Sequence, residues 1–560
     1  MQVASFLTVL SAAGCLLAFA GITPAAQVNP PAPIATNVPV TPSPGPQASV
    51  QPSPYPSFAP SVAPSVTPLP TPTPTPPPIV VDPASAQVAV GFDQTLRVGS
   101  ALGPISATVA DAKVVAIRID QDAQTVILTG LAPGSTTLTI VDRRGITATV
   151  PIHVAYDAGS VADATTVRIT GDPADQDFVR EVAAQAARAA ARARPGAQIV
   201  LATDSIPYNA PLAQDDVATI DVPVLVQGND YISVDGTTHV RVENQAAPKI
   251  QPDSLLVSDY PETLTEDGVL FAADLKAERP SRFLFFHYNP AGQPARRIVL
   301  RAENASREPA LVQFIGGDGG PGSNEMEVGH TSTKRFLVHL VQNEGRIIEI
   351  PGSGSLNLVD QSLPPGNIVS STLQLRVLNG SVVHLTLFAQ DATQSPDAPL
   401  TSSMLLVGAR AHARGRYAIP EFHYSTLWNT TDPYLALSVG QIPLPNLLAG
   451  EALSGDYGVS QSFVIKVQNP TSHPQPIAIY ESPRGGRATG TYLIDGVLIQ
   501  SHATPPFSRY KIRQYVVPAK GFVRVTIVTI PDSGSSLPLQ LIFAPDDGSV
   551  APGAPGSPIY

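Results

Sequence analysis

A proline-rich segment, Asn29–Pro78, places the strongest constraint on what this chain can fold into. It holds 19 of the 59 prolines in the sequence, interleaved with Ser, Thr, Ala and Val. Each proline fixes φ and removes a backbone hydrogen-bond donor, so neither a helix nor a sheet is expected here. The sequence therefore predicts a disordered, extended and solvated linker over 27–78, with no core of its own.

The segment before the linker predicts export from the cytoplasm. Val3–Ile22 contains no charged residue, and Ala18-Phe19-Ala20 has the small residues of a cleavage site. We interpret 1–26 as a signal peptide. Two alternatives stay open, because the apolar run is long enough to span a bilayer as an uncleaved anchor and Cys15 is a candidate for lipidation. All three interpretations place the protein in the periplasm, on the cell surface or outside the cell.

Composition limits the partners and the chemistry of the remaining chain. A length of 560 residues predicts about three to four domains. The net charge of −11 argues against nucleic acid as a partner, because phosphate binding needs a basic face. A membrane contact is expected only through the N-terminal segment, if that segment is uncleaved. Cys15 is the single cysteine, so no disulfide or thiolate metal site is expected in the folded domains.

Alternating apolar and polar residues predict a mainly β protein, with tandem β-sandwich domains and one small α+β module after the linker. The first expected sandwich covers 79–157. Val115–Ile119 and Thr125–Ile140 alternate with a period of two, which is typical of half-buried strands. Glycines and prolines separate the alternating runs at the spacing of a sandwich.

This first domain resembles the bacterial Ig-like group 2 domain, and equally the related domain at the N-terminus of pilus-assembly secretins. The resemblance is carried by Gly91 and Leu96, Ala110-Asp111 before the strand at Val115, the run Gly130–Leu138, and the closing hairpin Asp142–Gly145. It implies a spacer or docking module and no enzyme. Nothing further along the chain resembles the pore-forming domain of a secretin.

The second expected domain, 163–248, is a small α+β module. Phe178, Val182 and Ala186 recur at helical spacing, which predicts the one convincing helix of the sequence from about Ala174 to Ala193. Short strands are expected before and after this helix.

Two copies of one β-sandwich are predicted over 252–395 and 400–550. Val299–Asn304 corresponds to Val464–Asn469 at an offset of 165 residues, and Leu385–Asp391 corresponds to Leu539–Asp546 at an offset of about 155. A repeated order with a drifting offset indicates copies with loops of different length. Residues 551–560 are expected to form a flexible tail.

No motif predicts a catalytic, cofactor-binding or metal site. Gly316–Gly322 has backbone groups that suit an ion, but it contains a single carboxylate and is interpreted as a long hairpin loop. His412 and His423, with Glu421, come nearest to a metal cluster, yet their spacing matches no helical His-Glu motif. His287 is expected on a strand near the edge of a core.

Four residues are candidates for ligand binding: Trp428, Tyr424, Arg484 and Arg487. Exposed aromatic rings stack on sugars or form interface hot spots, and arginines amid glycines hold carboxylates or phosphates. The alternatives are that the aromatic rings belong to the core of the second copy, and that both copies share a Gly-rich loop for architectural reasons.

These features favour a non-catalytic exported protein of the bacterial cell envelope. It would display binding or spacer domains on a proline-rich stalk, in adhesion, pilus-associated assembly or envelope scaffolding. Its expected partners are proteins or glycans of the envelope. The alternative is an exported enzyme acting on polysaccharide or peptidoglycan, with Ig-like accessory domains. A pocket with several convergent carboxylates or histidines in one copy would favour the enzyme.

Overall fold

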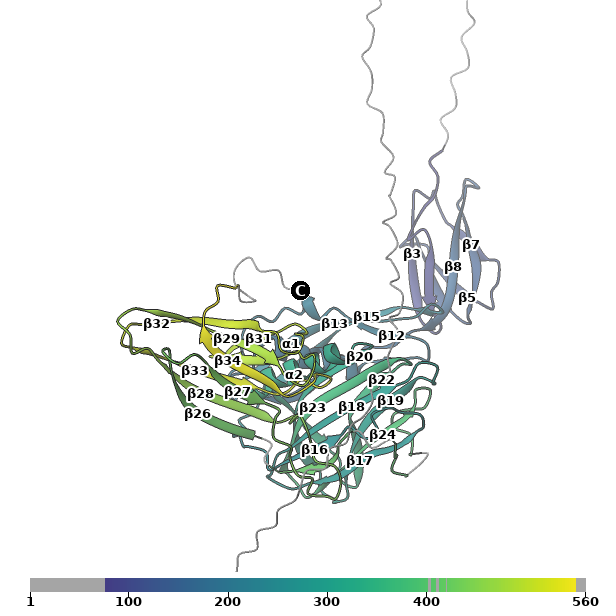
Figure 1. The fold of residues 1–560 in the computed structure, drawn as a ribbon. Coiled ribbons are helices and arrows are strands. Elements are labelled where there is room, and N and C mark those ends of the chain that lie inside the picture. Colours follow the sequence, from purple (N-terminus) through teal and green to yellow (C-terminus); the bar gives the residue numbers. More distant parts are fainter. Residues whose placement is uncertain (1–75, 401–403, 409–411, 419–420, 550–560) are drawn as a thin grey trace, which may run out of the picture. The chain divides into compact units, whose positions relative to one another are not determined.

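The computed structural model describes residues 76–400, 404–408, 412–418 and 421–549. Strands dominate these ranges (Figure 1), which confirms the mainly β fold. The expected leader (1–26), all but the last three residues of the linker (27–78), and the expected tail (551–560) lie outside the described residues. No helix in the described part is both long and apolar enough to cross a membrane.

The first sandwich has the two sheets that its alternating sequence predicted. One sheet contains, in order, β1 (Val80–Asp82), β3 (Asp93–Gly99), β6 (Thr125–Gly130) and β5 (Val115–Asp120). The other contains β14 (Tyr231–Ile232), β8 (Thr147–Asp157), β7 (Gly134–Val141) and β4 (Ser106–Val109), with β2 (Ala86–Ala89) also paired to β8. Leu96, Leu128 and Leu138 are fully buried in its core.

The segment that follows combines one helix with short and long strands. Its strands are β9 (Gly159–Ser160), β10 (Ala164–Thr170), β11 (Arg192–Ala193), β12 (Gln198–Leu201), β13 (Val217–Gln227) and β15 (Val234–Asn244), with a 3-10 turn at Thr203–Ser205. Helix α1 (Gln176–Ala190) starts where Asp175 caps it by accepting a hydrogen bond from the amide of Asp177. The apolar face of α1 packs on this sheet, as the helical spacing of Phe178 and Val182 predicted.

A ten-stranded sheet joins this segment to the next one. Its order is β12-β13-β15-β10-β21-β20-β23-β18-β16-β25. The new strands are β16 (Ser254–Ser258), β18 (Ser281–Asn289), β20 (Ala310–Gly322), β21 (Gly345–Ile350), β23 (Asn367–Asn379) and β25 (Arg414–Tyr417). The junction is the antiparallel pairing of β10 with β21, from Arg168↔Ile347 to Thr170↔Gly345. The α+β segment and the first repeat thus share one sheet, which the sequence did not indicate.

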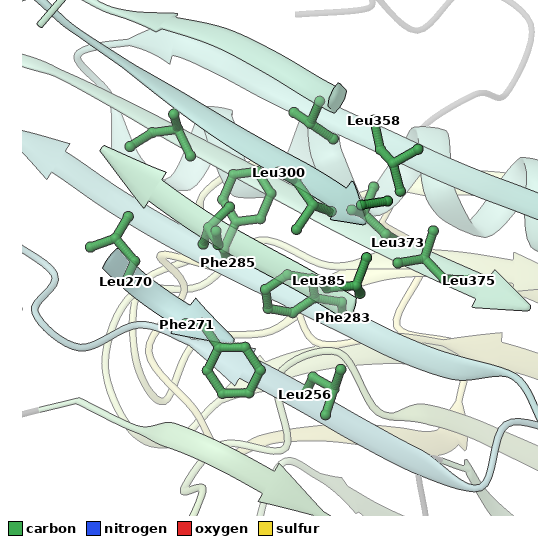
Figure 2. Packing of buried hydrophobic residues seen from close by; sticks show 14 of the residues in the cluster. Leu256, Leu270, Phe271, Phe283, Phe285, Leu300, Leu358, Leu373, Leu375 and Leu385 are labelled. Atoms are coloured by element: carbon green, nitrogen blue, oxygen red, sulfur yellow. The ribbon is translucent and has the colours of Figure 1, made fainter. Parts of the chain in front are cut away.

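A smaller sheet covers one part of the ten-stranded sheet and completes the first copy of the repeat. It contains β17 (Gly268–Leu275), β24 (Val383–Asp391), β19 (Arg296–Asn304) and β22 (Gly354–Leu363). Figure 2 shows the core, in which Phe283 and Phe285 of β18 lie among leucines of both sheets. Alternation along these strands brings every second side chain into the same layer.

The C-terminal sandwich also has two sheets. One contains β26 (Glu421–Asn429), β28 (Ser460–Gln468), β33 (Phe522–Thr529), β30 (Thr491–Ile494) and β31 (Val497–Gln500). The other contains β27 (Leu435–Val439), β34 (Leu539–Pro545), β29 (Gln475–Pro483) and β32 (Tyr510–Val517).

The strand pairing of β16–β24 and β26–β34 is the same. Strand β18 lies between β16 (parallel) and β23, and β28 lies between β26 (parallel) and β33. Strand β19 lies between β22 and β24, and β29 lies between β32 and β34. The 155-residue offset correctly relates β24 to β34. The 165-residue offset is wrong by one strand, because it aligns β19 with β28, whose counterpart is β18.

Asparagines that close loops explain the misalignment. The Nδ2 atom of Asn289, at the end of β18, donates to the carbonyl of Leu363 at the end of β22. Asn469, after β28, donates in the same way to Val517 at the end of β32. Asn304, at the end of β19, closes the next loop by donating to the carbonyls of Ile350 and Pro351. Because an asparagine closes the loop after several strands in the same way, local sequence similarity aligns β19 with β28 in place of β18 with β28.

The glycine-rich segment Gly316–Gly322 is a strand, so its interpretation as a hairpin loop was wrong. It forms the second half of β20 and pairs with β23. Helix α2 (Glu325–Gln342), which the sequence did not predict, lies directly on it. Asn324 caps the start of α2, and Asn343 ends it in the left-handed conformation with φ of 56°. The glycines therefore make room for a helix instead of forming a turn.

Candidate functional site

The two candidate aromatic residues lie on β26 but face different surroundings. Trp428 is 3% exposed and packs edge-on against Phe543, with ring centroids 6.3 Å apart. It belongs to the core of the C-terminal sandwich. Tyr424 is 38% exposed and stacks on Phe463 with centroids 5.1 Å apart. Of the pair, Tyr424 presents the larger fraction of its surface to a partner.

The two candidate arginines follow β29, in the other sheet of the same sandwich. Arg484 donates from Nε to the side-chain oxygen of Gln540 at 2.9 Å, and its guanidinium lies over the ring of Phe507. The side chain of Arg487 is exposed, and its carbonyl accepts from the amide of Ser536. No described contact joins these arginines to the aromatic pair on β26.

The histidines that came nearest to a metal cluster lie in separate places. His423 is 3.7 Å from the Oε2 atom of Glu421. His412 instead contacts Asp259 at 3.1 Å and Glu262 at 2.7 Å, and these carboxylates raise its pKa to about 10. Among the described residues, no group of three or more His, Cys, Asp or Glu side chains is suited to a metal ion.

His287 lies on β18, as the sequence predicted, and is fully buried. Its Nδ1 atom is 2.9 Å from the carbonyl of Pro261, and its Nε2 atom is 3.2 Å from the hydroxyl of Ser258. Burial lowers the pKa of His287 to about 4, so the ring is neutral at physiological pH. It serves the packing of the first copy.

A buried polar cluster under α2 was missed by the sequence reasoning. His330 of α2 is 2.6 Å from the Oδ2 atom of Asp532, and the hydroxyl of Thr489 donates to that same oxygen at 2.8 Å. Nearby, Tyr492 donates to Glu481 at 2.8 Å. Burial raises the pKa of the Glu481 carboxyl to about 7. No local motif signals this cluster, because His330 and Asp532 are 202 positions apart.

This cluster attaches the first copy to the C-terminal sandwich. Glu481 and Asp532 are at most 1% exposed, so neither carboxylate reaches solvent. Gly329 of α2 lies against the backbone of Ser533, where an added Cβ would collide with the Ser533 carbonyl. The arrangement suits a structural clamp, because a substrate has no direct route to the buried acids.

A second buried contact joins the two copies at β26. The guanidinium of Arg282, on β18, is fully buried and lies 3.2 Å from Glu421 at the start of β26. It also donates to the carbonyl of Gly458 at 3.1 Å. These contacts hold the start of β26 against the first copy. The rest of β26 is the outer strand of its sheet.

Strand β26 is the outer strand of the five-stranded sheet (Figure 1). It pairs with β28 along all nine of its residues, and no strand among the described residues pairs with its other edge. Tyr424 and Leu427, which is 49% exposed, lie on this strand. An unpaired edge with apolar side chains is a surface that binds another strand.

Comparison with known proteins identifies the first sandwich. Residues 80–155 match the family described as pilus formation protein N terminal region. This confirms the resemblance to the N-terminal domain of pilus-assembly secretins, which was one of the two families that the glycine-rich signature and the closing hairpin indicated. No curated protein sequence matches the chain.

Many solved structures are similar to parts of the chain, and three of them serve as examples. The human desmocollin-1 ectodomain is 11% identical over 32% of this chain and 43% of its own, with a TM-score of 0.13. The tandem Ig repeats of Dlar are 9% identical over 30% of this chain and 99% of their own, with a TM-score of 0.13. The Bacteroides ovatus protein SGBP-B, in complex with mixed-linkage heptasaccharide, is 11% identical over 53% of this chain and 70% of its own, also with a TM-score of 0.13. Similarities at this level carry no argument about function.

Proposed function

We propose that this chain is a non-catalytic, exported protein of the bacterial cell envelope that takes part in pilus assembly. Its β-sandwiches act as docking and spacer domains displayed on the proline-rich segment. The observation that carries the proposal is the match of residues 80–155 to the pilus formation N-terminal region. We also propose the domain boundaries 79–157, 163–248, 252–395 and 400–550, in which the second and third segments share one sheet and β25 of the last segment extends that sheet.

An exposed apolar pair on the first sandwich supports a docking role for that domain. Phe92 is 59% exposed and Leu131 is 49% exposed. Both are next to the glycine signature, where the amide of Gly130 donates to the carbonyl of Phe92. Neighbouring apolar side chains left in solvent are typical of a protein interface. We propose that this pair contacts another component of the assembly apparatus.

The enzyme alternative has less support. A hollow between the ends of β12 and β13 is lined by polar residues, and the side chains around it include one carboxylate, Asp230, and no histidine. The acid that lies closest to a histidine, Asp532, is enclosed under α2. Neither place offers convergent acid and base groups to a glycan substrate.

Complementation of a gene deletion in the native host tests the proposed function. We expect the deletion to reduce surface pili, and the wild-type gene to restore them. The double variant Phe92→Asp and Leu131→Asp should fold, because both side chains are exposed, and should fail to restore pili. The matched control is Leu102→Asp, which is 57% exposed in the same domain. Unchanged pili in the deletion strain, or equal rescue by the double variant, would refute the docking role.

A further inference from the structure

The first copy of the repeat has a closed edge at β16. Strand β25 pairs with β16 in antiparallel register, from Leu255↔Tyr417 to Ser258↔Arg414. Beyond it, the amide of Leu447 donates to the carbonyl of Arg416 at 2.7 Å, and Asn446 donates to that of Arg414 at 3.0 Å. Two layers of chain therefore cover the strand at this side of the sheet.

Within the described residues, the second copy lacks this cover. Strand β26 is the counterpart of β16, because each runs parallel to the equivalent central strand, β28 or β18. Where β25 lies in the first copy, no strand of the described residues lies beside β26. The comparison of the two copies thus identifies a strand position beside β26 that no described residue fills.

The sequence of β26 does not protect this edge. Exposed edges in soluble proteins carry lysines, prolines or bulges that prevent pairing. Between Glu421 and Asn429 there is no lysine, arginine or proline, and the pairing with β28 runs without a register shift. Ser425, at the centre of the strand, is exposed. The open edge therefore suits a strand from another molecule.

We propose that the occupant is a second copy of this chain, with two β26 strands paired antiparallel about Ser425. Identical strands that pair antiparallel are related by a two-fold axis, which closes a dimer. In this register Glu421 faces Asn429 and His423 faces Leu427, so no like charges are opposed.

The same register preserves the layers of the sandwich. Tyr424 stacks on Phe463 and Trp428 packs on Phe543, so both point toward the core side of the sheet. Tyr424 lies opposite Thr426 of the other copy, and residues of equal parity stay on one face. The dimer joins the five-stranded sheets of the two copies into one sheet across the axis and covers the exposed part of Tyr424. It does not depend on the proposed role in pilus assembly.

Light scattering of the purified full chain, coupled to size exclusion, tests the dimer. The expected mass is twice that of one chain. Ser425→Lys should lower it to the mass of one chain, because two lysines would meet directly across the axis. Val516→Lys is the control, since Val516 is 65% exposed on β32, the outer strand of the other sheet. It should leave the dimer intact.

A cross-link tests the register. Opposed residues in an antiparallel pair have Cα atoms about 4.5–5.5 Å apart, within the range that a disulfide spans. In a Cys15→Ser background, Ser425→Cys should give a disulfide-linked dimer under mild oxidation, and Val516→Cys should not. A monomeric wild type, a dimer that survives Ser425→Lys, or cross-linking through Val516→Cys in place of Ser425→Cys would overturn the proposal. Because these assays use purified protein, they separate this inference from the pilus phenotype.

Discussion

Replacement of Gly317 by alanine should displace α2 from the sheet beneath it. Gly317 lies in β20, and a Cβ built there would be 2.5 Å from the carbonyl oxygen of Ser332 and closer still to the amide nitrogen of Phe336. Both atoms belong to the backbone of α2, so no side-chain rotation can relieve the collision. Either the helix or the strand must move.

The expected cost follows from the rigidity of these neighbours. Overpacking a well-packed interior costs about 1–3 kcal/mol, and a collision with helix backbone belongs at the upper end, about 3 kcal/mol. For a unit of this size, 1 kcal/mol shifts the melting temperature by about 2–4 °C, so we expect a decrease of about 6–12 °C. The shift should appear in the unfolding transition of the ten-stranded sheet, because β20 is one of its central strands.

Differential scanning calorimetry is the suitable assay, because it resolves separate transitions in a multidomain chain. The matched control is Gly322→Ala on the same strand, where the added Cβ would be 2.9 Å from Cγ2 of Val328 alone. That contact is with one side-chain methyl group and not with helix backbone, so the control should change stability by less than about 1 kcal/mol. Equal melting temperatures for the two variants would refute the close-contact explanation for the glycines of β20.

Three further predictions concern the C-terminal sandwich. Burial raises the pKa of the Glu481 carboxyl from 4.5 to about 7. The stability that the protonated carboxyl contributes is therefore complete below pH 4.5 and is lost as the pH rises through 7. Glu481→Gln should flatten the decline in melting temperature between pH 5 and 8 by about half or more, and an unchanged profile would contradict this assignment. Asn469→Ala removes donors to the carbonyls of His473, Val517 and Pro518 and should cost about 3 kcal/mol in calorimetry, whereas a loss below about 1 kcal/mol would show that the loop does not need the cap. Trp428 should show blue-shifted fluorescence that iodide does not quench, because it is 3% exposed; strong quenching would place it on the surface instead.

Local patterns predicted elements whose partners are close in sequence. The run Thr125–Gly130 alternates in sequence, and in the structure its side chains alternate between the core and a half-buried face. Helix α1 was expected from apolar residues at helical spacing, and the structure ends it at Ala190, three residues before the predicted end. In both cases the pattern reflects burial of one face, which depends only on residues within the element.

Helix α2 escaped prediction because its buried face mixes apolar residues with small and polar ones. Gly329, Ser332 and Thr333 are buried in α2 alongside Val328 and Phe336. Small and polar residues are needed where the helix touches β20 and Ser533 at short range. These small and polar residues weaken the apolar periodicity from which a helix is predicted. The glycines of β20 were read as a loop for the same reason, since the neighbour that explains them lies elsewhere in the fold.

The candidate residues were predicted by type but not by environment. The sequence identified Tyr424 and Trp428 as a pair, and the structure separates them by exposure, because Trp428 is near the end of β26 that the core covers. The clamp of His330 and Asp532 could not be predicted, because its members come from different copies of the repeat. No spacing rule connects side chains that meet only after two domains pack.

The sequence by itself determined the proline-rich composition of Asn29–Pro78, the mainly β character of the chain, the two families that the first sandwich resembles and the existence of an internal repeat. These properties follow from residue type and from periodicity within short segments. Only the tertiary structure decided which strands are neighbours: that β10 joins β21, that β28 corresponds to β18, and that β25 covers β16 while the edge of β26 stays open. Strand order is set by which edges and faces remain to be covered once the elements have formed, and that information is distributed over the whole chain.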